Sequence, residues 1–432
     1  MSEFNIGVVG LWHLGCVLSA AWTKLGFKVV GFDPSNDIIE DLKKNRPPVF
    51  EPDLAEMLMR AREKIKLNFT NDIGLLRDCD FVFLAYDTPV LDNDESDLSP
   101  LQNAIDKFGN VLKDNTVVIV SSQTPVGTCQ RFRDQLQNKN LTLELVYSPE
   151  NLRLGEAIQC YLNPGRIIIG AESEIAFSKI MPLFQKIQAE IIKMNLASAE
   201  MMKHALNSFL ANSIVFANHL ADLCEVSGAN IFDVVKGLKT DPRIGHKAYL
   251  APGIGFSGGT LGRDLKILAK TNKKFKQEAF LFESILNFNS DRKIAILNKV
   301  NELLDKKFSG KVISVLGLTY KPGTSTLRRS LPLDIVKLLA QKGATIKVYD
   351  PKANYEELNE ELSFRICNSI DEAITKSNLI ILLTEWNEFK EYDWKKGSKL
   401  LKDRKIFDAK NFLYDLKLAK LGYEYFGVGF KD

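Results

Sequence analysis

The stretch NIGVVGLWHLG, residues 5–15, decides the fold of this chain. Its first part, Asn5–Val9, is a short apolar run rich in β-branched residues, which favours a strand. A glycine-containing turn follows. The pattern then predicts a helix from about Cys16 to Leu25, a second strand over Lys28–Phe32 and an acid, Asp33, at its end. A strand, a glycine turn, a helix and a parallel strand form the repeating unit of doubly wound sheets. We therefore predict an α/β fold that begins with a Rossmann-type parallel sheet.

The alternation of strands and helices continues along the chain, pauses and then starts again. Further strands are expected over Phe81–Ala85, Val117–Val120, Leu143–Tyr147 and Arg166–Gly170. Helical patterns cover about residues 198–226 and 278–304, and new strands are expected over Lys311–Leu316, Thr345–Asp350 and Leu379–Leu383. We predict three domains: an NAD-binding Rossmann domain at residues 1–195, a central helical domain at 196–300 and a C-terminal Rossmann-like nucleotide-binding domain at 301–432.

The composition is that of an ordinary globular protein, with 45% hydrophobic and 26% charged residues over 432 positions. A formal net charge of +3 gives no reason to expect a nucleic acid or an anionic membrane surface as a partner. The six cysteines lack CxxC spacing and the four histidines lack HxxxH spacing, so we expect reduced thiols and no metal site. No apolar run approaches the length of a membrane span, and the first residues do not resemble a signal peptide. We therefore expect a cytoplasmic protein.

The turn after the first strand is a candidate phosphate-binding site. A complete GxGxxG motif has a glycine where Trp12 stands, while Gly10 and Gly15 are kept. Asp33 lies near the spacing of a carboxylate that binds the ribose hydroxyls of an adenosine, and it would repel a 2′-phosphate, which favours NAD over NADP. The alternative is a tight turn that binds nothing. The predicted NAD-binding residues of this turn are Gly10, Trp12, His13, Leu14, Gly15 and Asp33, with His13 either touching a cofactor phosphate or only solvated.

A second informative segment is the loop DPRIGHKAYLAPGIGFSGGTLGRD, residues 241–264. Its glycines and prolines argue against a regular helix or strand and let the backbone come close to a ligand. The loop also gathers charged side chains that suit an anionic substrate, namely Arg243, His246, Lys247, Arg263 and Asp264.

Further motifs are spread along the chain: FEPDL (50–54), FVFLAYDTP (81–89), TPVGT (124–128), SPENLRLGEAI (148–158), MMKHALNSF (201–209), GLTYKPGTSTLRRS (317–330), TEWNEF (384–389) and FDAKN (407–411). In this order, and together with the loop at 241–264, these motifs resemble those of the UDP-glucose/GDP-mannose 6-dehydrogenase family. The catalytic loop of that family reads approximately GFGGSCFPKD. The resemblance covers essentially the whole chain. It implies an NAD-dependent oxidoreductase of polysaccharide biosynthesis that acts on a CH–OH group of a nucleotide sugar. It also implies that the central domain carries the active-site loop and the dimer interface.

The resemblance also implies roles for particular residues. Lys203 and Asn207 lie four apart and so share one helix face, where Lys203 would act as a base or position a water. Without the resemblance, Lys203 would instead be a solvated helix residue paired with an acid. The implied catalytic residues are Lys203, Asn207, Asp264, Thr260 and Glu150. Thr88, Thr124 and Arg328 join the NAD-binding set, and the substrate-binding set is Glu150, Leu152, Arg153, Lys203, Asn207, Arg243, Tyr249, Gly255, Gly258 and Lys321.

Thr260 stands where the resembling family carries its catalytic cysteine. A thiolate is accessible near neutral pH and can hold an aldehyde covalently, whereas a threonine hydroxyl stays protonated. Departures at Gln123, Leu154, Gly262 and Arg263 concern the same centre. We therefore expect a two-electron oxidation or otherwise altered chemistry, such as oxidation and return of a hydride in an epimerase. The alternative is a non-catalytic sugar-nucleotide-binding regulator or partner of a true dehydrogenase. The nucleotide, the sugar and the oxidised carbon stay open.

The helical pattern over residues 198–226 is apolar on more than one face, and such a helix needs burial on several sides. We therefore predict a homodimer or a higher homo-oligomer. The resemblance implies the same, because the central domain of that family forms a two-fold interface and the equivalent of Arg243 reaches toward the neighbouring site.

Overall fold

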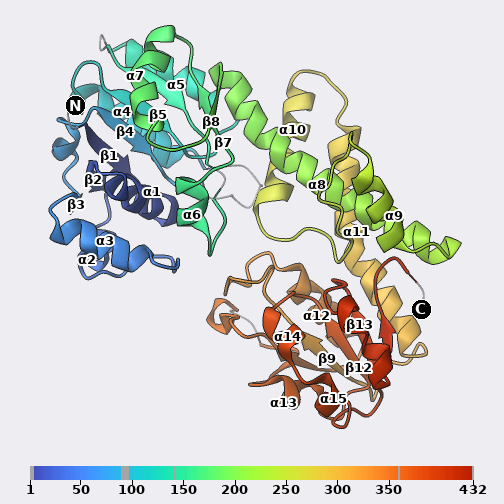
Figure 1. Cartoon of the computed structure of the whole chain (residues 1–432). Coiled ribbons are helices and arrows are strands. Elements are labelled where there is room, and N and C mark those ends of the chain that lie inside the picture. Colours follow the sequence, from blue (N-terminus) through green and yellow to red (C-terminus); the bar gives the residue numbers. More distant parts are fainter. Residues whose placement is uncertain (1–3, 89–96, 140–141, 151, 359–360, 431–432) are drawn as a thin grey trace. The chain divides into compact units, whose positions relative to one another are not determined.

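The computed structural model describes residues 4–88, 97–139, 142–150, 152–358 and 361–430. The chain forms two compact units, which we call the N-terminal unit (Met1–Ala205) and the C-terminal unit (Leu206–Asp432), each with its own sheet (Figure 1). Within the described ranges, no helix combines the length and the apolar character that a membrane span requires. The same ranges contain no group of three or more His, Cys, Asp or Glu side chains that could hold a metal ion.

The N-terminal unit is built on an eight-stranded sheet in the order β3-β2-β1-β4-β5-β6-β7-β8. Neighbouring strands are parallel, except that β6 and β7 meet antiparallel at Tyr147 and Gly170. Because β1 pairs with both β2 and β4, the strand order reverses beside β1, and doubly wound sheets bind ligands at the carboxyl ends of the strands there. The strands are β1 Asn5–Val9, β2 Lys28–Phe32, β3 Leu67–Thr70, β4 Phe81–Leu84, β5 Val117–Val120, β6 Glu144–Tyr147, β7 Arg166–Gly170 and β8 Glu190–Met194.

Helices cover both faces of this sheet, because successive side chains of a strand point to opposite faces. Ile6 and Val8 of β1 pack in the cluster that includes α1, whereas Val9 packs in the cluster of α4 and α5. Helix α1 begins three residues before the predicted Cys16, because the backbone of Trp12 already has the extended conformation of an N-cap residue. The helices are α1 His13–Lys24, α2 Asn36–Lys43, α3 Leu54–Glu63, α4 Ser99–Val111, α5 Thr128–Gln137, α6 Ala157–Leu162 and α7 Glu174–Phe184, with a 3-10 turn at Ile73–Leu76.

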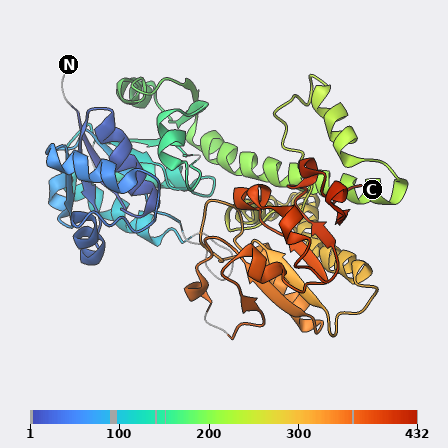
Figure 2. The same ribbon diagram turned by 60° about the horizontal axis from the view of Figure 1, so that its bottom comes forward.

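Helix α8, Leu196–Ser227, is a single uninterrupted helix that runs from the N-terminal unit into the C-terminal unit (Figures 1 and 2). It confirms the helix predicted over residues 198–226. Helix α11, Phe280–Leu303, likewise confirms the helix predicted over residues 278–304. Two further helices, α9 Ile231–Thr240 and α10 Thr260–Lys274, lie between them in the sequence.

The C-terminal unit contains a six-stranded parallel sheet in the order β11-β10-β9-β12-β13-β14, coloured orange to red in Figure 2. Its order reverses beside β9, as the first sheet does beside β1. The α/β class with Rossmann-like sheets at both ends of the chain is therefore confirmed, while the three domain ranges stay a prediction. The elements are β9 Val312–Leu316, α12 Leu331–Gln341, β10 Thr345–Tyr349, β11 Arg365–Ile366, α13 Ile370–Ile374, β12 Leu379–Leu382, α14 Asn387–Glu391, α15 Trp394–Gly397, β13 Lys405–Asp408 and β14 Glu424–Phe426, with 3-10 turns at Tyr355–Glu357, Tyr414–Leu416 and Leu418–Leu421.

Candidate functional site

The turn between β1 and α1 keeps the two glycines that its geometry requires. Gly10 has a φ of 90°, which other residues rarely adopt. A Cβ on Gly15 would lie 1.8 Å from the carbonyl oxygen of Gly10, so only glycine lets the helix begin this close to the turn. Trp12 has an ordinary φ of −82° and is 46% exposed, so the missing middle glycine does not distort the turn. The N-terminus of α1 therefore presents its amides as a phosphate site normally does.

Asp33 anchors this turn and keeps acceptor positions unused. One carboxylate oxygen accepts a hydrogen bond from the backbone N–H of Leu11 (2.8 Å), and the other accepts one from Ser35 (2.9 Å). A carboxylate offers about four acceptor positions in all, some of which several donors can share, and Asp33 uses two of them. Asp33 can therefore accept further bonds, as binding of the two ribose hydroxyls of NAD requires.

Asp350 occupies the corresponding position in the second sheet, at the end of β10, but its carboxylate is fully engaged. One of its oxygens accepts from the amides of Leu318 and Thr319, the Thr319 hydroxyl and the indole N–H of Trp386, while the other accepts from the amides of Lys352 and Ala353. A Cβ on Gly317 would also lie 2.5 Å from the side chain of Thr384. The acceptor positions that Asp33 leaves open are therefore already taken at Asp350.

His13, at the start of α1, is held by a buried acid rather than being only solvated. Its Nε2 lies 3.0 Å from Oε2 of Glu51, whose carboxylate also accepts the backbone N–H groups of Gly155 and Ala157. Glu51 thereby joins the NAD-binding turn to the segment that follows β6. Contact between His13 and a cofactor phosphate stays a prediction.

The first turns of α8 bind the loops that follow β5 and β6. Lys203 is buried, and its ammonium donates to the backbone carbonyl of Glu150 at 2.5 Å, so it is not the solvated residue of the alternative interpretation. The carboxylate of Glu150 accepts the backbone N–H of Leu152. Both loops extend from the carboxyl ends of neighbouring parallel strands, which is the ligand edge of the sheet.

Two residues beside Lys203 that the sequence did not single out fix the same edge. Glu200 is completely buried and accepts the Thr124 hydroxyl (3.0 Å) and the backbone N–H groups of Gly127 (2.7 Å) and Cys129 (2.9 Å). His204 is also completely buried. Its Nε2 lies 2.9 Å from the carbonyl oxygen of Thr124 and must carry the proton, since a carbonyl only accepts. The segment that begins with Gln123 is thus tied to α8.

In the C-terminal unit, the structure brings Asn207 and Asp264 together. The amide of Asn207 donates to Oδ2 of Asp264 at 2.5 Å, and Nε of Arg263 lies 3.6 Å from Oδ1. Asp264 is completely buried. Thr260 is the first residue of α10 and is exposed. Its hydroxyl can exchange hydrogen bonds with a ligand or with water.

The remaining predicted residues are positioned as follows. Arg243 and Arg153 are exposed and pair with their sequence neighbours Asp241 and Glu156. Thr88 and Thr124 are buried in the N-terminal unit, Tyr249 is 54% exposed, Arg328 is exposed and Lys321 is half-buried. Gly255 and Gly258 both have positive φ, and a Cβ on either would press against Asn289 or Tyr320.

The C-terminal unit also contains a cavity of about 280 Å³ that the sequence did not reveal as such. One wall is the segment from Tyr249 to Gly255, and another comes from the loops after β12 and β13. The ammonium of Lys390 lies 4.3 Å above the ring centre of Phe412, and Lys410 pairs with Glu385 at 3.1 Å. An aromatic ring and two ammonium groups suit a ligand that combines a flat base with phosphates, and such a ligand would replace Lys390 on the ring and Glu385 at Lys410. The motifs at 384–389 and 407–411 pointed to this region, as did the predicted substrate-binding residues Tyr249 and Gly255.

Comparisons with known proteins agree along the whole chain. Residues 4–188, 197–291 and 314–415 match the NAD binding, central and UDP binding domains of the UDP-glucose/GDP-mannose dehydrogenase family. The UDP-glucose 6-dehydrogenase of Rickettsia typhi is 33% identical over 99% of this chain and 100% of its own, and TuaD of Bacillus subtilis is 34% identical over 98% and 93%.

Solved structures show the same likeness. A UDP-glucose dehydrogenase from Pyrobaculum islandicum superposes with a TM-score of 0.88 at 26% identity, over 99% of this chain and 98% of that one. A UDP-D-ManNAc dehydrogenase from Pyrococcus horikoshii gives a TM-score of 0.85 at 26% identity, over 99% of both chains. The predicted cofactor, NAD, and the predicted oxidoreductase class are confirmed. The chain belongs to the UDP-glucose/GDP-mannose dehydrogenase family.

Proposed function

We propose that this protein oxidises a CH–OH group of a UDP-sugar and that it transfers a single hydride per sugar to NAD. The cavity with Lys390, Lys410 and Phe412 carries the substrate half of the proposal, because it offers an aromatic face and two cations within the stretch that matches a UDP binding domain. The names of the relatives above favour UDP-glucose as the first substrate to test.

The spare acceptor positions of Asp33 support the cofactor half, since NAD when bound accepts the hydride. The hydride leaves the C–H bond of the sugar carbon, and we assign the proton of its hydroxyl to Lys203, which accepts it as the neutral amine and becomes an ammonium group. Glu150 would orient Lys203 through its backbone carbonyl, and Asn207 and Asp264 would hold a substrate hydroxyl or a water. The products of this step are a carbonyl and NADH, which balances both electrons and the proton.

Thr260 limits the proposed reaction to this first oxidation. Covalent capture of the aldehyde needs an accessible thiolate, and five of the six thiols are buried. Burial raises the pKa of the Cys79 thiol to about 12 and raises the pKa values of Cys16 and Cys129 as well. The sixth thiol, Cys160, lies on α6 in the N-terminal unit. The five buried thiols therefore do not offer themselves in place of the one that Thr260 replaces.

The direct test is NADH formation with a panel of UDP- and GDP-sugars. NADH with a UDP-sugar supports an oxidoreductase. If sugar nucleotides bind, as measured by calorimetry, while no member of the panel yields NADH, the chain is instead the non-catalytic regulator or partner. Mass analysis of the product identifies the carbon oxidised.

We further propose that the protein is at least a homodimer and that α8 forms the contact. Phe209, Phe216 and Leu223 are 69%, 48% and 50% exposed and follow one another at seven-residue intervals. This spacing puts them in one stripe on a helix. An exposed stripe of large apolar side chains is a feature of protein interfaces. The unpaired cysteines also favour a reducing compartment, and we propose the cytoplasm.

A further inference from the structure

The loop that lines the cavity is held through its backbone by side chains of two helices. The backbone N–H of Gly253 donates to Oδ1 of Asn218 on α8 at 2.7 Å, and its carbonyl accepts Nε of Arg292 on α11 at 3.1 Å. The backbone N–H and the backbone carbonyl of Gly253 are thus both bound by side chains. Gly253 and Asn218 line the cavity, whereas Arg292 does not.

Three residues further along the loop, Phe256 is bound in the same way. Its N–H donates to Oδ1 of Asn289 (2.8 Å), and its carbonyl accepts Nδ2 of the same side chain (2.9 Å). A Cβ on the intervening Gly255 would lie 2.6 Å from Oδ1 of Asn289, so the amide can come this close only to a glycine. Asn289 and Arg292 lie three apart on α11 and therefore face the loop together.

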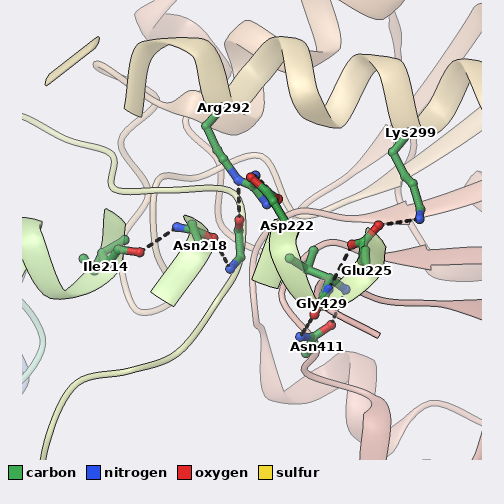
Figure 3. A network of polar contacts seen from close by, with 10 residues as sticks. Ile214, Asn218, Asp222, Glu225, Arg292, Lys299, Asn411 and Gly429 are labelled. Carbon is green, nitrogen blue, oxygen red and sulfur yellow. Dashed lines mark hydrogen bonds and ion pairs between the residues drawn. The ribbon is translucent and has the colours of Figure 1, made fainter. Parts of the chain in front are cut away.

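Arg292 is fixed independently of the loop. It is only 4% exposed, and one terminal nitrogen donates to both carboxylate oxygens of Asp222, at 2.6 and 2.8 Å (Figure 3). The planar guanidinium group of Arg292 therefore binds the carboxylate of Asp222 and the carbonyl of Gly253 at the same time. The ammonium group of a lysine lacks this geometry and cannot make both contacts.

Seven residues after Arg292 on α11, Lys299 forms a similar ion pair, but this pair makes no bond to residues 253–256. Lys299 donates to Glu225 at 2.8 Å, and the other oxygen of Glu225 accepts the backbone N–H of Gly429 at 2.9 Å (Figure 3). This pair holds the C-terminal segment instead. It joins the same two helices as the pair of Arg292 and Asp222, and so it provides a matched control.

We propose that Asn289 and Arg292 are positioning residues that hold residues 253–256, of which Gly253 and Gly255 line the cavity, in a fixed conformation before a ligand arrives. They act through the backbone of the loop, and Thr260 at the start of α10 follows four residues after the bound segment. A loop that is ordered in advance loses less conformational entropy on binding, which strengthens binding. The identity of the ligand as a UDP-sugar rests on the proposed function. The positioning of the loop by Asn289 and Arg292 does not depend on it.

The test compares Arg292→Lys and Asn289→Leu with the control Lys299→Met. Arg292→Lys keeps a charge for Asp222 but loses the bond to Gly253, and Asn289→Leu keeps the volume but loses both bonds to Phe256. We expect each to weaken UDP binding, measured by calorimetry, by about tenfold. We expect the affinity for NAD to stay within about twofold of wild type. Lys299→Met should lower the melting temperature to a similar degree and leave UDP affinity unchanged.

Amide hydrogen exchange reports on the loop without any ligand. In wild type the amides of Gly253 and Phe256 should exchange slowly, and Asn289→Leu should speed exchange at Phe256 while the amide of Gly429 stays protected. Unchanged exchange, or an equal loss of UDP affinity in Lys299→Met, would overturn the proposal. If wild type binds no UDP or UDP-sugar but the exchange results are as expected, the proposed function fails while the positioning of the loop stands.

Discussion

At the scale of single residues, Asp33 and Asp350 distinguish the turn after β1 from the otherwise similar turn after β9. Both acids end the second strand of a βαβ unit and accept the amide of the residue after a left-handed glycine. Asp33 accepts two hydrogen bonds in the structure and Asp350 accepts six. The two acids thus differ in hydrogen-bond occupancy and not in residue type, and we expect only Asp33 to accept hydrogen bonds from ribose hydroxyls.

Asp33→Asn tests this assignment. The amide oxygen can still hold the N–H of Leu11, but the charge and one acceptor for the ribose are lost. We expect NAD affinity to fall by about tenfold and the preference for NAD over NADP to shrink, because a 2′-phosphate is no longer repelled. Calorimetry with both cofactors measures this. NADP binding as tightly as NAD to wild type would contradict the role of Asp33.

Asp350→Asn is the matched control. It replaces a buried acceptor of six hydrogen bonds, so it should destabilise the C-terminal unit by about 1–3 kcal/mol while NAD affinity stays as in wild type.

At the scale of elements, helix α8 could be predicted from the sequence, whereas its contacts with the ligand edge of the first sheet could not. The helix itself was predictable, since its apolar residues recur with helical spacing and its observed bounds differ by two residues or fewer from the predicted ones. The bonds made by Glu200 were not predictable. Its partners lie more than 70 positions away in the sequence. An acid in the first turns of a helix is ordinarily solvated, and only the packing of α8 against the loop after β5 buries this one.

The same limit applies to the C-terminal unit. The glycines of the loop at 241–264 indicated a close backbone contact, and the structure identifies Asn289 and Tyr320 as what lies against Gly255 and Gly258. Arg292 carried no sequence signal, because a lone arginine in an amphipathic helix usually faces solvent. The family motifs therefore located the loops, whereas the side chains that hold those loops came from the structure.

Glu200→Gln should destabilise the N-terminal unit. An amide offers one acceptor oxygen and would direct its own donors at the N–H groups of Gly127 or Cys129, so at least one buried amide loses its partner. We expect a loss of about 1–3 kcal/mol in the free energy of unfolding. Denaturant unfolding followed by fluorescence measures it, and the exposed Glu174→Gln should change stability by less than about 0.5 kcal/mol. Equal effects of the two variants would show that the bonds of Glu200 contribute little.

At the scale of the whole molecule, the exposed stripe on α8 predicts assembly. Phe216→Asp puts a charge in the middle of the stripe without touching a buried residue. We expect this variant to be a monomer by light scattering at micromolar concentration, where wild type is a dimer or larger, because an unpaired charge opposes burial of the stripe. Ile175→Asp, at another exposed apolar position, should leave the assembly intact. A monomeric wild type would contradict the proposed interface.

The extent of oxidation depends on residues of both units, because NAD binding is assigned to the N-terminal unit while Thr260 belongs to the C-terminal unit. Without a thiol at position 260 no thiohemiacetal forms, so we expect about one NADH per sugar and little acid. Counting NADH against sugar consumed, with mass analysis of the product, measures this directly.

Two NADH per sugar with a carboxylate product would mean that an aldehyde hydrate is oxidised instead, with Glu150 or Lys203 as its base. Thr260→Cys separates the possible causes of a single oxidation. At the N-terminus of α10, the helix dipole favours a thiolate at this position. The variant should therefore gain acid formation if the other residues of the site still support it. A variant that binds NAD and UDP-sugar as wild type does, yet forms no acid, would assign the altered chemistry to positions such as Gln123 and Leu154 rather than to the missing thiol alone.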